Sequence, residues 1–172
     1  MVKRMSVRAA LLVCALSLTG RPGAAGGAER ELPELNRKVL KFAEDHLGQQ
    51  VGNGECWTLA ADALTHAGAQ RPGAGGVGVL DFGRRLGPGE AILPGDVVQF
   101  EKARFVHKTR TGTSTHTMPH HTAIISGVKG KTITLLHQNH GGKKTVATAS
   151  INLDERTEGT VEFFRPRSKK TR

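Results

Sequence analysis

Four residues of this chain are suited to nucleophilic chemistry: Cys56, His121, His137 and Asn139. A cysteine nucleophile needs a thiolate, an imidazole that takes and returns a proton, and a polar group that orients the imidazole. Cys56 follows a loop with two glycines and begins an apolar, alanine-rich stretch. This pattern predicts a helix that starts at the thiol, where free N–H groups and the helix dipole stabilise a thiolate. The alternative is a small buried residue that happens to be a cysteine.

The first 28 residues have the pattern of a secretory signal peptide. A basic start precedes an apolar run over 9–18, which is too short to span a bilayer, and small residues follow. Cys14 would leave with this segment, so the mature chain would keep Cys56 alone. Exported proteins normally pair their cysteines, and a single one therefore indicates reactivity. We expect a secreted, periplasmic or extracellular protein with no membrane span after signal removal.

Hydrophobic periodicity predicts the elements that must position these side chains. Apolar residues at helical spacing indicate a helix over 30–47 and a second from 56 to about 69. Strands are expected at 97–100, 122–128, 132–137, 144–151 and 160–164, and the polar, threonine-rich segment 108–119 is expected to be a loop. Helices followed by antiparallel strands make an α+β domain. We place this domain at 29–166, followed by a basic, disordered tail at 167–172.

The two histidines are expected to meet because of a hairpin. The turn Lys129-Gly130-Lys131 joins the strand that follows His121 to the strand that ends at His137. In a hairpin the start of one strand faces the end of the next. His121 should therefore lie near the segment from His137 to Asn139.

Four segments of the chain, in this order, resemble segments of the CHAP and NlpC/P60 cysteine amidases and peptidases. They cover about residues 50–140 and comprise Gly54-Glu55-Cys56-Trp57, Leu93-Pro94-Gly95-Asp96-Val97-Val98, His120-His121-Thr122-Ala123-Ile124-Ile125 and Ile133-Thr134-Leu135-Leu136-His137-Gln138-Asn139. The resemblance implies a papain-like fold. It also implies that Cys56 is the nucleophile and His121 the general base.

The same resemblance leaves the other site residues open. CHAP proteins have a glutamate where this chain has His137, NlpC/P60 relatives use a histidine in a comparable role, and Asn139 matches the CHAP asparagine. His120 replaces the usual glycine and competes with His121 for the base. The Cys56 N–H would hold the oxyanion together with Gln50, which has the spacing of the oxyanion glutamine of papain-type proteases.

These observations predict a secreted cysteine hydrolase that cleaves an amide or peptide bond through a Cys56 thioester and needs no cofactor. By resemblance, the substrate would be cell-wall peptide or a peptidoglycan-like polymer. The net charge of +10 also favours attraction to anionic surface polymers. Specific nucleic-acid binding is disfavoured, because aromatic residues make up only 4% and tyrosine is absent. A non-catalytic polymer-binding module on the same fold is the alternative.

A second alternative is that the chain binds a metal ion. The hydrolase hypothesis assigns no metal ligands. Imidazole-rich sites suit zinc, copper or nickel, and Cys56 would then be a further ligand. The histidines that would converge are His116, His120, His121, His137 and His140.

Overall fold

The structure is a computed structural model that describes residues 31–73 and 80–169. The predicted signal peptide and the last three residues of the predicted tail lie outside the described residues. The elements in chain order are α1 (Glu34–Asp45), α2 (Cys56–His66), β1 (Arg84–Arg85), β2 (Val97–Thr109), β3 (Gly112–Lys129), β4 (Thr132–His137), β5 (Ala147–Asn152), a 3-10 turn (Leu153–Glu155) and β6 (Arg156–Arg165). The expected α+β architecture is confirmed.

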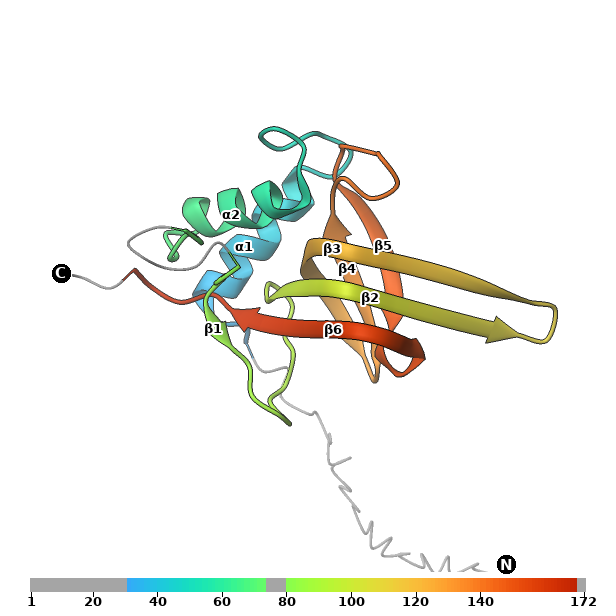
Figure 1. Cartoon of the computed structure of the whole chain (residues 1–172). Coiled ribbons are helices and arrows are strands. Elements are labelled where there is room, and N and C mark those ends of the chain that lie inside the picture. The colour runs from blue at the N-terminus through green and yellow to red at the C-terminus, as the bar shows by residue number, and fades with distance from the viewer. Residues whose placement is uncertain (1–30, 74–79, 170–172) are drawn as a thin grey trace, which may run out of the picture. The chain divides into compact units, whose positions relative to one another are not determined.

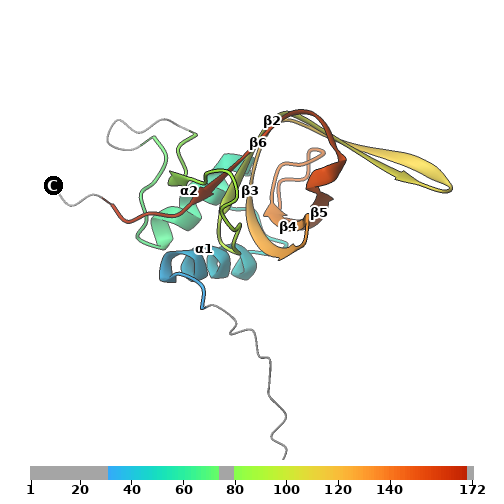
Figure 2. The ribbon, with the colours of Figure 1, turned by 90° about the horizontal axis from the view of Figure 1, so that it is seen from below.

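The strands form one antiparallel sheet in the order β1-β6-β2-β3-β4-β5. Both helices lie beside the same end of the sheet (Figure 1). Seen from below, the sheet curls strongly, so that β4 and β5 turn back toward β6 (Figure 2). The helices contact one face of the sheet, and the curl encloses the other.

The period-2 pattern of the strands divides the core into two clusters. Val97, Ile124 and Leu136 face the helices and pack with apolar residues of α1 and α2. Their neighbours along the strands, such as Ile125 and Leu135, face the concave side and join a second cluster. At this end of the sheet the two central strands are buried on both faces, over 97–100 of β2 and 121–125 of β3, so most of their residues there are apolar.

The prediction of a loop over 108–119 is wrong. These residues belong to a long hairpin, in which β2 and β3 keep one antiparallel register from Val97↔Ile124 to Thr109↔Gly112. The distal half of the hairpin extends beyond the sheet as a two-stranded arm (Figure 1). The segment is polar because both faces of this arm are largely exposed, and its threonines suit extended backbone.

The turn before β2 ties the sheet to α1. Gly95 has a φ of +83° and lies so close to the carbonyl of Asn36 that a Cβ would collide with it. Asp96 is fully buried, accepts from Asn36 Nδ2 at 2.8 Å and forms an ion pair with Arg165 at 2.9 Å. A carboxylate without solvent contact requires such partners, so these bonds join α1, β2 and β6.

Ordered contacts continue into the predicted tail. Arg167 donates to Gln70 and to Asp81 at 2.9 and 3.1 Å, and Ser168 pairs with Ala69. Within 31–73 and 80–169, neither helix has the length and apolar character needed to cross a membrane.

Candidate active site

Cys56 is the first residue of α2, as the sequence predicts. Asn53 fixes the approach to this helix, because its Oδ1 accepts from the Glu55 N–H at 3.1 Å and from the Thr58 hydroxyl at 2.7 Å. Cys56 is 9% exposed. It is the one free cysteine in the described part of the chain, and no hydrogen bond there engages its thiol or its N–H. The N–H at a helix start has no partner within the helix and is therefore available to a ligand.

His121 and His137 form a direct hydrogen bond, with His121 Nε2 and His137 Nδ1 2.9 Å apart. The pairing of β3 with β4 extends from Lys129↔Thr132 to Ile124↔Leu136, and His121 lies just beyond it. His137 is the last residue of β4, so the hairpin brings the two imidazoles together at the end of the ladder. The predicted proximity is confirmed, although His121 lies within the long strand β3 and not at its head.

A buried glutamine joins the end of β4 to the start of α2. Gln138 is 1% exposed, and its amide donates to the carbonyls of Val51 and Glu55, each at 2.9 Å. Its Oε1 accepts from the Val51 N–H at 3.1 Å. Cys56 and His137 are the chain neighbours of Glu55 and Gln138, so this link brings the start of α2 to the end of β4. Sequence reasoning missed this role of Gln138.

Burial keeps the imidazole pair neutral. Desolvation, together with the nearby rings of His137 and His140, lowers the pKa of His121 to about 3. Desolvation and His140 also lower the pKa of His137 to about 4. Both side chains are therefore uncharged near neutral pH. With one proton between them, His121 Nε2–H can donate to His137 Nδ1 and leave His121 Nδ1 as an acceptor.

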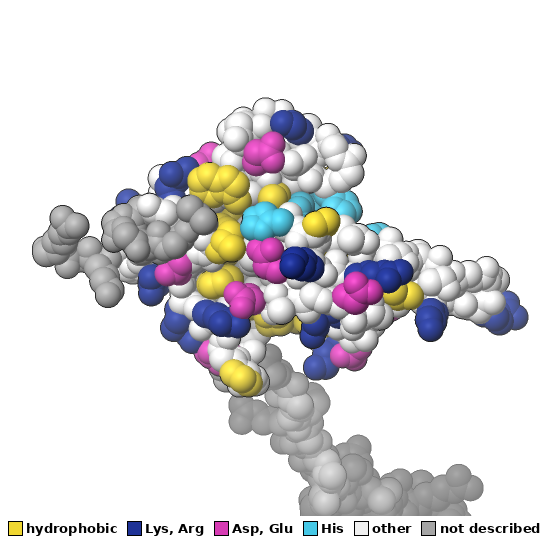
Figure 3. All heavy atoms as spheres, viewed as in Figure 1, with side chains coloured by type: hydrophobic (Ala, Val, Ile, Leu, Met, Phe, Trp, Pro, Cys, Tyr) yellow, Lys and Arg dark blue, Asp and Glu magenta, His cyan; other side chains and the backbone are white. Residues whose placement is uncertain are grey.

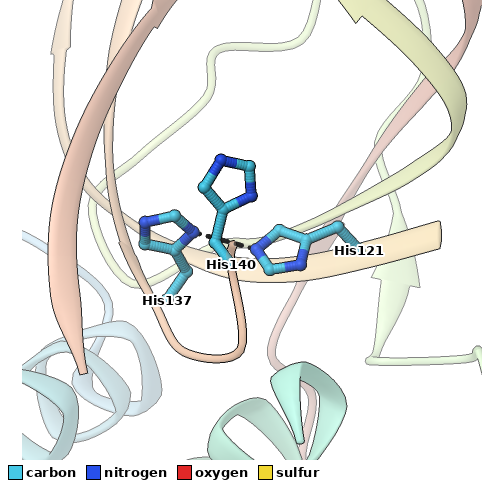
Figure 4. A group of neighbouring side chains, drawn as sticks. All are labelled: His121, His137 and His140. Atoms are coloured by element: carbon cyan, nitrogen blue, oxygen red, sulfur yellow. Dashed lines mark hydrogen bonds between the residues drawn. The ribbon is translucent and has the colours of Figure 1, made fainter. Parts of the chain in front are cut away.

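A third imidazole completes the cluster. The ring centroid of His140 lies 5.5 Å from that of His121 and 5.2 Å from that of His137. One ring nitrogen from each of the three lies within 4.8 Å of the others. Figure 4 shows the His140 ring over the hydrogen bond between the other two, with Nδ1 of His121 on the side of α2.

The cluster opens to solvent through a cleft of about 400 Å³. Its lining comes from two segments, residues 115–121 of β3 and residues 139–141 of the turn after β4. Histidine side chains gather in a band across this face (Figure 3). Among the described residues that line the cleft, four are histidines and none is an aspartate or glutamate.

The other predicted residues take different positions. Asn139 has a φ of +57°, and its amide donates to Glu55 Oε2 at 2.6 Å, so in this structure it does not orient His121. Gln50 is exposed, and its amide donates to the Gly52 carbonyl at 3.2 Å. His120 is half exposed, with Nδ1 2.7 Å from Glu101 Oε1. Of the two adjacent histidines, only His121 therefore joins the cluster.

The two helices, the curled antiparallel sheet and the cysteine at a helix start define a papain-like cysteine proteinase fold. The family model described as "AIM3/BBC1 Cysteine proteinase-fold domain" matches residues 33–171. The chain therefore belongs to this family. The resemblance to CHAP and NlpC/P60 enzymes holds at the level of the shared fold.

Individual relatives support the same assignment. Altered inheritance of mitochondria protein 3 of Debaryomyces hansenii is 31% identical over 145 residues, which cover 74% of this chain and 15% of that protein. The chain thus spans a small part of this curated relative. The crystal structure of Ly7917 has a TM-score of 0.50 at 18% identity, over 76% of this chain and 62% of that one. A second structure, of Ly7917 with the hydrolyzing product of MDP, has a TM-score of 0.50 at 20% identity. These two structures show the fold.

Proposed function

We propose that this domain is a cysteine hydrolase that cleaves an amide or peptide bond, with Cys56 as nucleophile, His121 as general base and His137 as the group that orients His121. The observation that carries the proposal is the His121–His137 hydrogen bond beside the helix start that bears Cys56. The bond uses His121 Nε2 and leaves Nδ1 on the side of α2 (Figure 4).

The reaction follows from these positions. Cys56 Sγ attacks the carbonyl carbon of the substrate, and the thiol proton passes to His121 Nδ1. The Cys56 N–H at the start of α2 donates to the oxyanion of the tetrahedral intermediate. His121 then gives the proton to the leaving nitrogen as the C–N bond breaks, which leaves a thioester on Cys56. Water, deprotonated by His121, attacks the thioester and releases the acid and the thiol.

His137 acts through His121. It accepts the Nε2 proton of His121, which fixes the tautomer and orients the ring as the third member of a catalytic triad does. Burial lowers the pKa of His121 to about 3, so the ring is neutral at rest and its Nδ1 keeps a lone pair.

The proposed substrate class is cell-wall peptide or a similar cross-linked polymer. Support comes from the Ly7917 structure that contains the hydrolyzing product of MDP, a protein of the same fold. We further propose that the chain is exported by its first 28 residues, and that the net charge of about +6 left after removal of their four basic residues holds it on anionic polymers.

One observation favours a second candidate, a polymer-binding module without catalysis: Cys56 is only 9% exposed. The rate of iodoacetamide labelling separates the two. We expect the full chain to be labelled at Cys56 at neutral pH at least about tenfold faster than a free thiol, and His121→Ala to remove this advantage. Cys56→Ala should abolish release of peptide from fluorescent peptidoglycan. Labelling at the rate of a free thiol or slower, in wild type and His121→Ala alike, would favour the binding module.

A further inference from the structure

The structure assigns a second capacity to the imidazole cluster: we infer that His121, His137 and His140 bind one zinc ion, and that the bound zinc switches off the proposed hydrolase. The second half of this inference rests on the proposed function, whereas the first half does not.

The three side chains form a ligand set of the right kind. One nitrogen from each lies within 4.8 Å of the others. Tetrahedral zinc with bonds of about 2.0–2.1 Å places its ligand nitrogens roughly 3.4 Å apart. The His121 and His137 nitrogens, now 2.9 Å apart, need to separate slightly, and His140 needs to approach. All three imidazoles are nearly in place, so little ordering is required.

His140 is the side chain that can make this approach. It is half-buried, and among the hydrogen bonds of the described residues none holds its ring. Its backbone stays fixed, because the Asn139 N–H donates to the Lys143 carbonyl at 2.7 Å across the turn. Rotation of the His140 side chain alone therefore closes the set. His121 and His137 are buried against the concave core and need only small shifts.

A zinc ion here would keep an open position. The group contains three nitrogens and no sulfur or carboxylate, and the cleft of about 400 Å³ borders His121 and His140. Three protein ligands and a water from the cleft complete four-coordination. Three neutral imidazoles also suit zinc better than hard cations such as magnesium or calcium, which prefer oxygen ligands.

Zinc and cysteine catalysis need different tautomers of His121. Zinc requires lone pairs on both His121 Nε2 and His137 Nδ1, so the proton between them moves to the other nitrogen of the ring that carries it. When it is carried by His121, as catalysis requires, it moves to Nδ1 with no change in net charge. A ring with Nδ1–H cannot accept the thiol proton of Cys56 there. Occupation by zinc therefore removes the general base.

The test uses the full chain, purified without a polyhistidine tag and stripped of metal by a chelator. Cobalt(II), with visible absorption bands that report tetrahedral coordination, is titrated first, and zinc then competes for the site. We expect one equivalent to bind to wild type and to His116→Ala. His140→Ala should lower the affinity at least about tenfold, since it removes one of three ligands. His116 is the matched control, because it lines the same cleft but lies outside the group.

Hydrolysis of fluorescent peptidoglycan, with and without one equivalent of zinc, tests the second half. In wild type and in His116→Ala, one equivalent of zinc should lower the rate of hydrolysis at least about tenfold. In His140→Ala, the rates with and without zinc should be nearly equal. If His140→Ala and wild type bind the metal with equal affinity, the proposed three-histidine zinc site is wrong. Undiminished hydrolysis by the zinc-loaded chain would overturn the switch. If no variant hydrolyses anything without metal, the proposed function fails, while the cobalt titration still decides the site.

Discussion

Gln138 and Glu55 are joined by a hydrogen bond from Gln138 Nε2 to the Glu55 carbonyl at 2.9 Å. Glu55 immediately precedes α2, and Gln138 immediately follows β4. The relative positions of Cys56 and His137 thus depend on a neighbour of each. Gln138 thus helps to set the geometry of the site, although its hydrogen bonds in the described part of the chain go to Val51 and Glu55 and not to the thiol or an imidazole.

Replacement of this glutamine should therefore affect both stability and reactivity. Gln138→Leu leaves the N–H and the carbonyl of Val51 buried without their partner. We expect a loss of roughly 2–4 kcal/mol, measured by urea unfolding, and slower iodoacetamide labelling of Cys56. Gln49→Ala, on an exposed side chain nearby, should change stability by less than about 0.5 kcal/mol. A fully stable Gln138→Leu would contradict the link between β4 and α2.

The buried imidazoles should make the metal-free protein sensitive to acid. The pKa values of His121 and His137 are about 3 and about 4 in the folded chain, and the ordinary value is 6.5. The unfolded chain therefore binds these protons first as the pH falls. The free energy of unfolding therefore has its full value, with respect to these two rings, above about pH 6.5. It falls progressively toward pH 4, by up to about 1.4 kcal/mol per pH unit for each ring.

Urea unfolding between pH 7 and pH 5, with a chelator present, measures this slope. The double variant His121→Gln, His137→Gln should flatten it, whereas His116→Gln, at an exposed histidine of the arm, should leave it as in wild type. A wild-type stability that does not change over this range would show that the two rings are protonated in the folded chain as well.

The sequence indicated most of the elements, because their apolar periodicity reflects burial that the folded chain realises. Both helices, the strand over 132–137 and the approach of His121 to His137 were predictable, since a short turn fixes which strand ends face each other. The arm of β2 and β3 was not predictable in this way. Its distal residues, 107–114, are polar and exposed on both faces, and their pairing depends on a register that periodicity does not encode.

Side-chain partners across the site were harder to predict than the elements. Asn139 follows β4, and alternation along the strand would place it on the same face as His137, two residues earlier. Its φ of +57° ends that alternation, and its amide reaches Glu55. The roles of Gln138 and His140 likewise arise from contacts between segments about 85 and 20 residues apart, which no local pattern reveals. The one sequence signal for Gln138 was its place in the Gln-Asn pair at the end of a predicted strand, which the family resemblance includes.

The buried ion pair between Asp96 and Arg165 should dominate the stability of the helix–sheet contact. Asp96→Ala leaves the Arg165 guanidinium without its carboxylate, and the Asn36 amide keeps only the Pro94 carbonyl as acceptor. We expect a loss of about 3–5 kcal/mol in urea unfolding. Glu31→Gln breaks the exposed pair with Arg37 and should cost less than about 1 kcal/mol. Comparable small losses in both variants would mean that the burial of Asp96 is relieved by solvent.

The loop before Cys56 should tolerate no side chain at Gly54. A Cβ there would lie 2.9 Å from the side chain of Lys144 and 3.1 Å from Gln50 Cδ, and the backbone φ is +79°. Gly48 has a φ of +80° with nothing within 4 Å of its Cβ position. Gly48→Ala therefore measures the backbone strain alone, about 1 kcal/mol. Gly54→Ala should cost more and should slow Cys56 labelling, because it displaces the approach to α2. Equal effects in both variants would exclude a steric role for this contact.

The final prediction separates orientation from mere packing at His137. His137→Ala removes the acceptor of the His121 Nε2 proton, so kcat should fall roughly a hundredfold or more while KM changes little. His137→Gln keeps a side-chain oxygen that can accept this proton and should recover part of kcat. A purely structural role for His137 predicts instead that activity in both variants follows the folded fraction, which circular dichroism and urea unfolding measure on the same samples. Partial rescue by glutamine at equal stability would establish that His137 works by holding the tautomer of His121.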